Sequence, residues 1–420
     1  MVATDPGAGG RRVTWVVVAI FVLAYAGLAL GRLPGLAIDR SGIAVVAAVA
    51  LAAIGAVQPA EIAAAIHFPT LVLLFALMIL SDRFAAAGVH AHLAARIAAA
   101  AGSPTRLLIL TTMVAGGLSA VLVNDIVVFV MAPLLVGGLR ARGLDPRPFL
   151  AALAGAANAG SAATIVGNPQ NIVIGQVGGL DFLDFVLACG PPAIGALAIV
   201  VVAVRVVWRA ELAAPSVATA APPPPVARGP ARKAAIAALV LLVLFFAPVP
   251  RDLAALVVAA ALLPSRRFAS REMLAAVDWP LLALFASLFV INAALAQTGI
   301  TRAGLDWLAA QGLGFDTLRM MLPGALLASN SIGNVPAVIL LLAAEPDWSP
   351  GILQALALTT TLAGNFFLVG SIANLIVAER AAAAGVTFGF ADHARAGVPM
   401  TLASLALAAA WLVGTGRIGW

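Results

Sequence analysis

The residues best suited to chemistry in this chain lie in four short polar breaks inside long apolar stretches. The breaks are residues 124–125 (ND), 167–171 (GNPQN), 329–334 (SNSIGN) and 370–374 (GSIAN). Gly and Pro interrupt the hydrogen-bond ladder of a helix. Backbone groups left unpaired in an apolar surrounding must be satisfied by protein or by a water-filled cavity. The four breaks therefore predict a polar cavity inside the molecule.

The breaks contain the residue types of an anion site, although none of them contains a cation. Asn, Asp and Ser cap helices well, so Asn124, Asp125, Asn171, Asn334 and Asn374 could each start the next half-helix. That structural role does not compete with binding, because a helix N-terminus carries partial positive charge and free N–H donors. We expect backbone dipoles and carboxamides to hold a small anion or oxyacid. The expected substrate-binding residues are Asn124, Gly167, Asn168, Asn171, Ser331, Asn334, Asn365, Gly370, Ser371 and Asn374.

Further polar residues lie on the arms that lead into the breaks, among them Asn158, Ser161 and Thr164, and Thr359, Thr360 and Thr361. These could complete the cavity. The alternative is helix–helix hydrogen bonding, which Ser, Thr and Asn routinely provide in membranes. We rank these residues below those of the breaks.

Asp125 is the one acidic residue that we place inside a span and away from its ends. A carboxylate at mid-bilayer costs roughly 2.5–3.5 kcal/mol on insertion scales, which makes it a functional candidate. We expect Asp125 to bind the coupling ion, H⁺ or Na⁺. A purely structural capping role has equal weight. Apart from this ion we expect no cofactor and no metal site.

The elements that position these residues must be membrane helices. Of the 420 residues, 63% are hydrophobic and only 10% are charged, with a mean hydropathy of +1.08. Soluble domains carry about 25% charged residues, so the composition excludes an ordinary soluble enzyme and a disordered chain. A crossing helix needs about 20 apolar residues. Ten spans are expected, near 13–31, 43–57, 69–82, 150–177, 184–204, 234–249, 252–264, 279–297, 352–378 and 398–415.

Two further apolar stretches, 106–139 and 318–344, contain a central break and predict re-entrant hairpins. Residues 83–100, which lead to the first of these hairpins, read as an interfacial helix. With these hairpins, eighteen Lys and Arg residues fall on one side and six on the other when the Pro/Ala-rich segment 210–232 is cytoplasmic. The positive-inside rule favours this orientation, with both termini outside.

The segment 210–232 separates two halves, 1–209 and 233–420, that resemble each other. Residues 67–89 align with 278–300 at an offset of 211, the hairpin tips at 124 and 334 differ by 210, and 163–175 align with 366–378 at an offset of 203. Five crossings per half would give the two repeats opposite orientation. Inverted repeats with broken helices are typical of secondary transporters, which bind substrate near the midplane.

The sequences LVNDIVVFVMAPLL, GSAATIVGNPQNIVIG, SNSIGNVPAVILLL and LAGNFFLVGSIANLIVAE resemble the paired signatures of the ion transporter superfamily. This group includes arsenite permeases, citrate-transporter-like proteins and divalent anion:sodium symporters. The tip at 124–125 is similar to the arsenite permeases, and VGNPQNIVIG to the citrate and anion permeases. The resemblance implies that each tip and its partner break line the substrate and ion site, in a homodimer that moves like an elevator.

The leading hypothesis is a secondary active transporter for arsenite or for an inorganic or carboxylate anion, coupled to H⁺ or Na⁺ through alternating access. We expect it in the inner (plasma) membrane as a multi-pass protein. A Na⁺/H⁺ antiporter is the alternative that Asp125 favours, and a passive channel is disfavoured by the inverted repeat. No catalytic constellation lies within the spans, so an enzyme is not expected. The scattered arginines form no basic stripe for nucleic acid.

Overall fold

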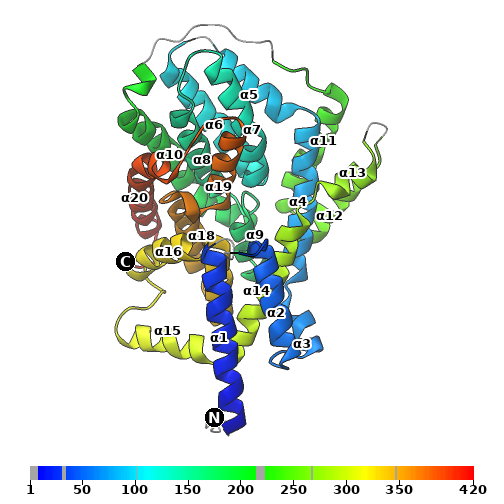
Figure 1. Cartoon of the computed structure of the whole chain (residues 1–420), viewed down its shortest axis with the longest axis vertical. Coiled ribbons are helices and arrows are strands. Elements are labelled where there is room, and N and C mark those ends of the chain that lie inside the picture. The colour runs from blue at the N-terminus through cyan, green and yellow to red at the C-terminus, as the bar shows by residue number, and fades with distance from the viewer. Residues whose placement is uncertain (1–7, 31–34, 101, 214–222, 266–267, 346–347) are drawn as a thin grey trace.

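The computed structural model describes residues 8–30, 35–100, 102–213, 223–265, 268–345 and 348–420. Within these ranges the regular secondary structure is helical, and an isolated bridge joins Thr317 and Gly419. Among the described helices, six are long and apolar enough to cross a membrane: α1, α4, α6, α10, α14 and α20. The prediction of an all-α membrane protein is confirmed (Figure 1).

The first half contains ten α-helices and one 3₁₀ turn in the described residues. They are α1 (Ala8–Leu30), α2 (Arg40–Ala53), α3 (Pro59–Ala65), α4 (Phe68–Ala86), α5 (Val89–Ala99), α6 (Pro104–Val121), α7 (Asn124–Arg140), α8 (Arg147–Ser161), α9 (Pro169–Val177), α10 (Phe182–Val207) and η1 (Glu211–Ala213).

The second half repeats this order in the part that the structure describes. Its elements are α11 (Arg228–Phe245), α12 (Arg251–Leu262), α13 (Ser270–Ala275), α14 (Trp279–Gln297), α15 (Ile300–Ala310), α16 (Leu318–Ser331), α17 (Asn334–Ala344), α18 (Pro350–Ala363), η2 (Leu368–Gly370), α19 (Ile372–Ala383) and α20 (Phe390–Gly414).

The predicted breaks divide helices where expected. The spans 150–177 and 352–378 are each two half-helices, α8 and α9 and then α18 and α19, joined by non-helical residues. The stretches 106–139 and 318–344 are the helical hairpins α6–α7 and α16–α17. The expected interfacial segment 83–100 contains the end of α4 and then α5, and its counterpart α15 was not expected from the sequence.

Equivalent local signals build equivalent elements in the two halves. His67 and Asp278, 211 positions apart, are the N-caps of α4 and α14, and each is followed by a Pro in the first turn. Gly88 and Gly299, again 211 apart, adopt left-handed backbone angles (φ 81° and 72°) that turn the chain into α5 and α15. Glycine reaches this conformation without steric cost.

Contacts at the helix ends show that the long arms run in opposite directions. Arg147, the first residue of α8, pairs with Asp392 in the first turn of α20. Gln354, near the start of α18, instead donates to Asp184 (2.6 Å), which also accepts from Arg417 beyond the end of α20. The starts of α8 and α18 therefore lie at opposite ends of α20.

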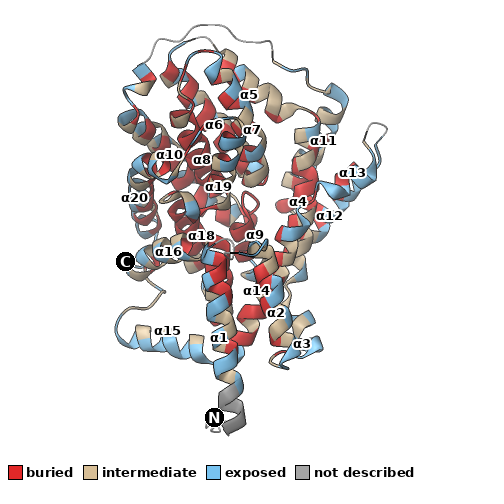
Figure 2. Ribbon diagram, viewed as in Figure 1, coloured by how far each residue is buried: buried red, intermediate tan, exposed pale blue. Residues whose placement is uncertain are grey.

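The halves exchange their outer helices. In the first half α4 packs against α11, α12 and α13 of the second half, whereas α14 packs against α1, α2 and α3 of the first. We call these helices the scaffold. The helices α5–α10 and α16–α20 pack among themselves as the core, with α8 buried at its centre (Figure 2). The exposed helix α15 contacts α14 and α17 at the periphery. Because helices of each half pack against a helix of the other half, neither half forms a complete scaffold by itself.

The Pro/Ala-rich segment 210–232 lies partly outside the described residues, which omit 214–222. Its end is held on the first half: the Ala227 amide donates to the Ala87 carbonyl (3.0 Å), and a ring nitrogen of His92 lies 2.9 Å from the Pro224 carbonyl oxygen. Helix α11 begins at Arg228, inside the segment that the sequence suggested was linker.

Candidate functional site

We call residues 162–168, between α8 and α9, the first break and residues 364–371, between α18 and α19, the second break; the first and second tips are the turns of the hairpins α6–α7 and α16–α17. The two breaks meet at the centre of the core, and each is held by an asparagine at an equivalent position. The side-chain Nδ2 of Asn171 donates to the backbone carbonyls of Ser161 (3.2 Å) and Thr164 (3.0 Å). The amide of Asn374, 203 positions later, donates to the carbonyls of Gly364 (2.8 Å) and Phe367 (3.3 Å), which are also 203 positions later. These bonds satisfy backbone groups that the breaks remove from the helix ladder.

The arm of each half also bonds the break of the other half. Asn158 on α8 donates to the Oδ1 of Asn374 (3.0 Å) and accepts from the Oγ of Ser371 (3.0 Å). Its equivalent on α18, Thr361, donates to the Oδ1 of Asn171 (3.2 Å) and accepts from the Nδ2 of Asn168 (3.3 Å). All six residues are fully or almost fully buried. The arm residues that the sequence ranked second thus lock the two breaks together.

Asn158 extends this network in two directions. Its Oδ1 also accepts from the Nδ2 of Asn124 (3.3 Å) at the first hairpin tip, and its Nδ2 donates to the Oδ1 of Asn365 (2.8 Å). Asn365 in turn donates to the Gly155 carbonyl (3.1 Å), and its own carbonyl lies 2.9 Å from the Nε2 of His393. One buried asparagine therefore ties the first hairpin to the second break.

The helix caps differ from the sequence-based expectation. The N-caps are Val123 for α7, Asn168 for α9, Gly333 for α17 and Ser371 for α19. The prediction that Asn124, Asp125, Asn171, Asn334 and Asn374 act as caps is therefore wrong, because each of them lies within the first turn instead. From the first turn, the long carboxamides of Asn171 and Asn374 reach back to the break carbonyls.

The first tip and the first break are packed tightly against each other. The backbone N–H of Asn124 donates to the Gly167 carbonyl (3.1 Å), and a Cβ at Gly167 would collide with the Ser161 carbonyl. The Oδ1 of Asn124 is buried and has no hydrogen-bond partner among the described residues, and the residue is only 3% exposed. A buried acceptor of this kind carries a desolvation cost, typically about 1–3 kcal/mol, that a ligand donor would offset.

The second tip and the second break enclose a small cavity of about 20 Å³. Gly333 and Asn334 line it from the tip, and Gly370 and Ser371 line it from the break. The N-termini of α17 and α19 both begin here, so two sets of first-turn N–H groups adjoin one space. Such groups lack intrahelical partners and favour an anion. Ser331, by contrast, is exposed at the end of α16.

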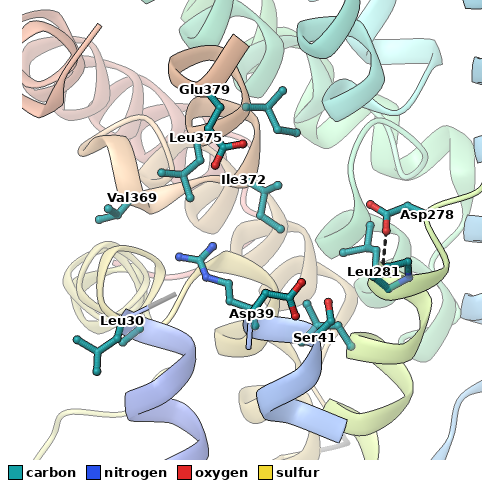
Figure 3. Close-up of a pocket in the computed structure, with 14 residues that line it drawn as sticks. Leu30, Asp39, Ser41, Asp278, Leu281, Val369, Ile372, Leu375 and Glu379 are labelled. Atoms are coloured by element: carbon teal, nitrogen blue, oxygen red, sulfur yellow. Dashed lines mark hydrogen bonds between the residues drawn. The ribbon is translucent and has the colours of Figure 1, made fainter. Parts of the chain in front are cut away.

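A larger cavity of about 760 Å³, which we call the vestibule, adjoins this small one, and both are lined by Arg40, Leu284, Val369 and Ile372. It lies between the scaffold helices α1, α2 and α14 and the core helix α19. In Figure 3 the carboxylates of Asp39, Asp278 and Glu379 approach it from three different elements. The Leu281 amide donates to Asp278 (2.9 Å), which anchors that side chain at the start of α14.

Arg40 is the only cationic side chain among the described residues that line the vestibule, and it lines the small cavity as well. Its Nε donates to the Leu28 carbonyl (3.1 Å) at the end of α1, which orients the guanidinium. Arg40 is not among the site residues expected from the sequence, because it lies outside the four polar breaks. No local signal could have revealed it, because α2 meets the second break only through the folded scaffold.

Asp125 lines a separate cavity of about 400 Å³ between α4, α7, α14 and α19. Asp82 and Asp278 line the same cavity, and Asp278 also lines the vestibule. Asp125 therefore shares its cavity with two other carboxylates, those of the half-buried Asp82 and the exposed Asp278. The described residues contain no group of three or more His, Cys, Asp or Glu that could hold a metal ion.

Comparison with known proteins places this arrangement among transporters. A family model described as citrate transporter matches residues 15–352. An uncharacterized transporter of Mycobacterium tuberculosis is 29% identical over 429 residues, which cover 94% of this chain and 97% of that protein. A silicon efflux transporter of Oryza sativa subsp. japonica is 28% identical over 450 residues, covering 89% and 92%.

Among solved structures, the YdaH transporter of Alcanivorax borkumensis superposes with a TM-score of 0.57 at 14% identity, covering 96% of this chain and 98% of that one. At this identity the likeness concerns the fold alone. The matches agree with the resemblance carried by the four sequence signatures.

Proposed function

The chain belongs to the citrate transporter family, and from this premise we propose that it is a secondary active transporter for a small anion or oxyacid. The candidate substrates are arsenite, inorganic anions and carboxylate anions. Transport is coupled to H⁺ or Na⁺ and proceeds by alternating access of one central site. The protein works as a homodimer in the inner (plasma) membrane.

The observation that carries this proposal is the vestibule that ends at two helix N-termini beside Arg40. First-turn N–H groups and a guanidinium are strong donors toward an oxyanion. The small cavity has room for about one water molecule, so substrate binding requires the second tip and break to separate slightly. The first tip and the first break are joined by a direct hydrogen bond. The second tip and the second break are therefore the pair between which we place the substrate.

Alternating access follows from the division into scaffold and core. Arg40 and Asp278 belong to the scaffold, whereas Ser371 and Glu379 belong to the core, and all four line the vestibule or the small cavity. Sliding of the core along the scaffold would carry the break away from Arg40 and change the side from which it is reached. Asp125, on the core, would meet Asp82 and Asp278 of the scaffold in one state only.

A Na⁺/H⁺ antiporter is the second candidate, and the three carboxylates around the 400 Å³ cavity favour it. An antiporter would move protons in response to Na⁺ without any anion. In proteoliposomes that contain a pH-sensitive dye, an imposed Na⁺ gradient distinguishes the two functions. Proton movement without added anion would replace the anion transporter by the antiporter.

The direct test is uptake of radiolabelled arsenite, phosphate and citrate into proteoliposomes under imposed pH and Na⁺ gradients. Accumulation of one of them above its external concentration supports the proposal, and equilibration without accumulation indicates a passive channel. Arg40→Gln should lower the uptake of that substrate about tenfold or more, because charge-assisted hydrogen bonds contribute roughly 1.5–3 kcal/mol. Arg319→Gln is the matched control, since Arg319 is exposed at the start of α16. Equal uptake by both variants would contradict the role of Arg40.

A further inference from the structure

A cavity lined by two cationic side chains lies away from the vestibule, on the outer side of the scaffold. It has a volume of about 240 Å³ and lies where the end of α4 meets α11, α12 and α13. Arg83 of α4 and Lys233 of α11 both line it, as does Phe268. Lys233 is the one lysine of the whole sequence. None of these residues belongs to the proposed transport path.

Arg83 is buried with part of its guanidinium unused. The residue is 7% exposed, and its Nη2 forms an ion pair with the carboxylate of Asp82. The guanidinium carbon lies 4.9 Å from the centroid of the Phe268 ring. Its Nε and Nη1 are buried and have no hydrogen-bond partner among the described residues. Buried donors on a cation carry a high desolvation cost unless an acceptor reaches them.

Lys233 adds a second cation to the same cavity. Its Nζ donates to the carbonyls of Leu262 (3.3 Å) and Pro264 (2.6 Å), at the end of α12. An ammonium group has three donors, so one of them has no partner within the described part of the chain. The carbonyls fix the ammonium in place without neutralising it. A guanidinium and an ammonium on two different helices therefore adjoin one cavity.

The cationic side chain of Arg83 has no counterpart at the equivalent position of the second half. Arg83 lies at the end of α4, where the positive-inside pattern puts the cytoplasmic surface. The equivalent position on α14, 211 residues later, is Ala294, which carries no charge. Anionic lipids give the cytoplasmic leaflet its negative surface potential, and basic pockets between transmembrane helices on that side bind their headgroups.

We propose that the cavity of Arg83 and Lys233 binds the phosphate group of an anionic phospholipid. The phosphate oxygens accept from the unpartnered guanidinium donors and from the ammonium, while the acyl chains lie along the apolar outer surfaces of α11 and α12. Because α4 belongs to the first half and α11 and α12 to the second, the lipid joins the two halves where their helices are exchanged. It stabilises the scaffold against which the core would move.

The test uses the purified full chain and native mass spectrometry with dioleoyl phosphatidylglycerol, dioleoyl phosphatidylcholine or inorganic phosphate. We expect phosphatidylglycerol to bind at least tenfold more tightly than phosphatidylcholine. Lys233→Gln and Arg83→Gln should each abolish this preference. Arg96→Gln is the matched control, because Arg96 is exposed on α5 and does not line the cavity.

Gly229→Leu keeps the test decisive if Arg83→Gln fails to fold, since it removes no charge. Gly229 lines the cavity, and a Cβ built there meets no atom within 4 Å. Its leucine side chain should fill the space and weaken phosphatidylglycerol binding about tenfold. An unchanged lipid preference in both Gly229→Leu and Lys233→Gln would overturn the proposal. Binding of inorganic phosphate without a preference for phosphatidylglycerol would overturn the assignment to a lipid.

Discussion

Replacing Asn158 by alanine tests how the two halves are held together. Its carboxamide makes four side-chain hydrogen bonds, to Asn124, Asn365, Ser371 and Asn374. All four partners are at most 6% exposed, so none can exchange the lost bond for bulk water. The substitution therefore leaves up to four buried polar groups without this partner.

The expected cost follows from the value of one such bond. Side-chain hydrogen bonds between membrane helices contribute about 0.6 kcal/mol on average, and those inside soluble proteins about 1 kcal/mol. Four bonds therefore predict that Asn158→Ala lowers the free energy of unfolding by about 2–4 kcal/mol. If the four former partners form hydrogen bonds with one another after the substitution, the loss of unfolding free energy should be near the lower limit.

Thr361→Val is the matched control, because Thr361 is the equivalent residue of the other half. Its hydroxyl bonds Asn168, Gln170 and Asn171 at 3.2–3.3 Å. Asn168 keeps a second acceptor, the Oγ of Ser161 at 2.9 Å, so fewer groups are left unpaired. We expect a loss of about 1 kcal/mol for this variant.

The assay is SDS titration of each variant in mild detergent, monitored by tryptophan fluorescence. A loss of stability for Asn158→Ala that does not exceed that of Thr361→Val would refute the reasoning. It would mean that apolar packing of α8, and not its polar centre, joins the hairpin to the second break.

Two further predictions concern the ion and the backbone of the break. Asp125→Asn should retain the fold but lose the dependence of uptake on the pH or Na⁺ gradient, since a carboxamide cannot take up a proton in this range. Asp316→Asn is the control, because Asp316 lies on an exposed loop. Gradient-driven accumulation by Asp125→Asn at the parent rate would exclude Asp125 as the ion site. Gly167→Ala should destabilise the protein by about 1–3 kcal/mol through overpacking against the Ser161 carbonyl. Gly117→Ala, where a Cβ meets no atom within 4 Å, should be neutral or stabilising in the same thermal unfolding assay.

Much of the architecture could be predicted because it depends on local properties of the chain. Apolar stretches of sufficient length become membrane helices, and Gly, Pro and Asn interrupt them where the structure has its breaks at 162–168 and 364–371. The hairpins and the repeated order of elements follow from the same patterns. The cap positions were wrong, because Asn171 and Asn374 share the residue type of a cap but lie three positions beyond it.

The substrate path could be predicted only in part. The family resemblance implied that the second tip and the second break lie together, and residues of both line one small cavity. Ser331 was included because it lies in the same polar run, but it is the last residue of α16 and faces outward. Whether a polar residue near a helix end faces the site depends on a rotation of about 100° per residue, which a polar run does not reveal.

The sequence by itself determined where helices form, where they break and that the chain lies in a membrane, because transfer free energies and backbone preferences act residue by residue. Only the tertiary structure decided which residues meet. The exchange of α1–α3 and α11–α13 between the halves brings Arg40 beside the second break and Asp278 beside Asp125. Those residues are separated by more than 150 positions, and their proximity arises from the packing of helices whose apolar surfaces look alike in the sequence.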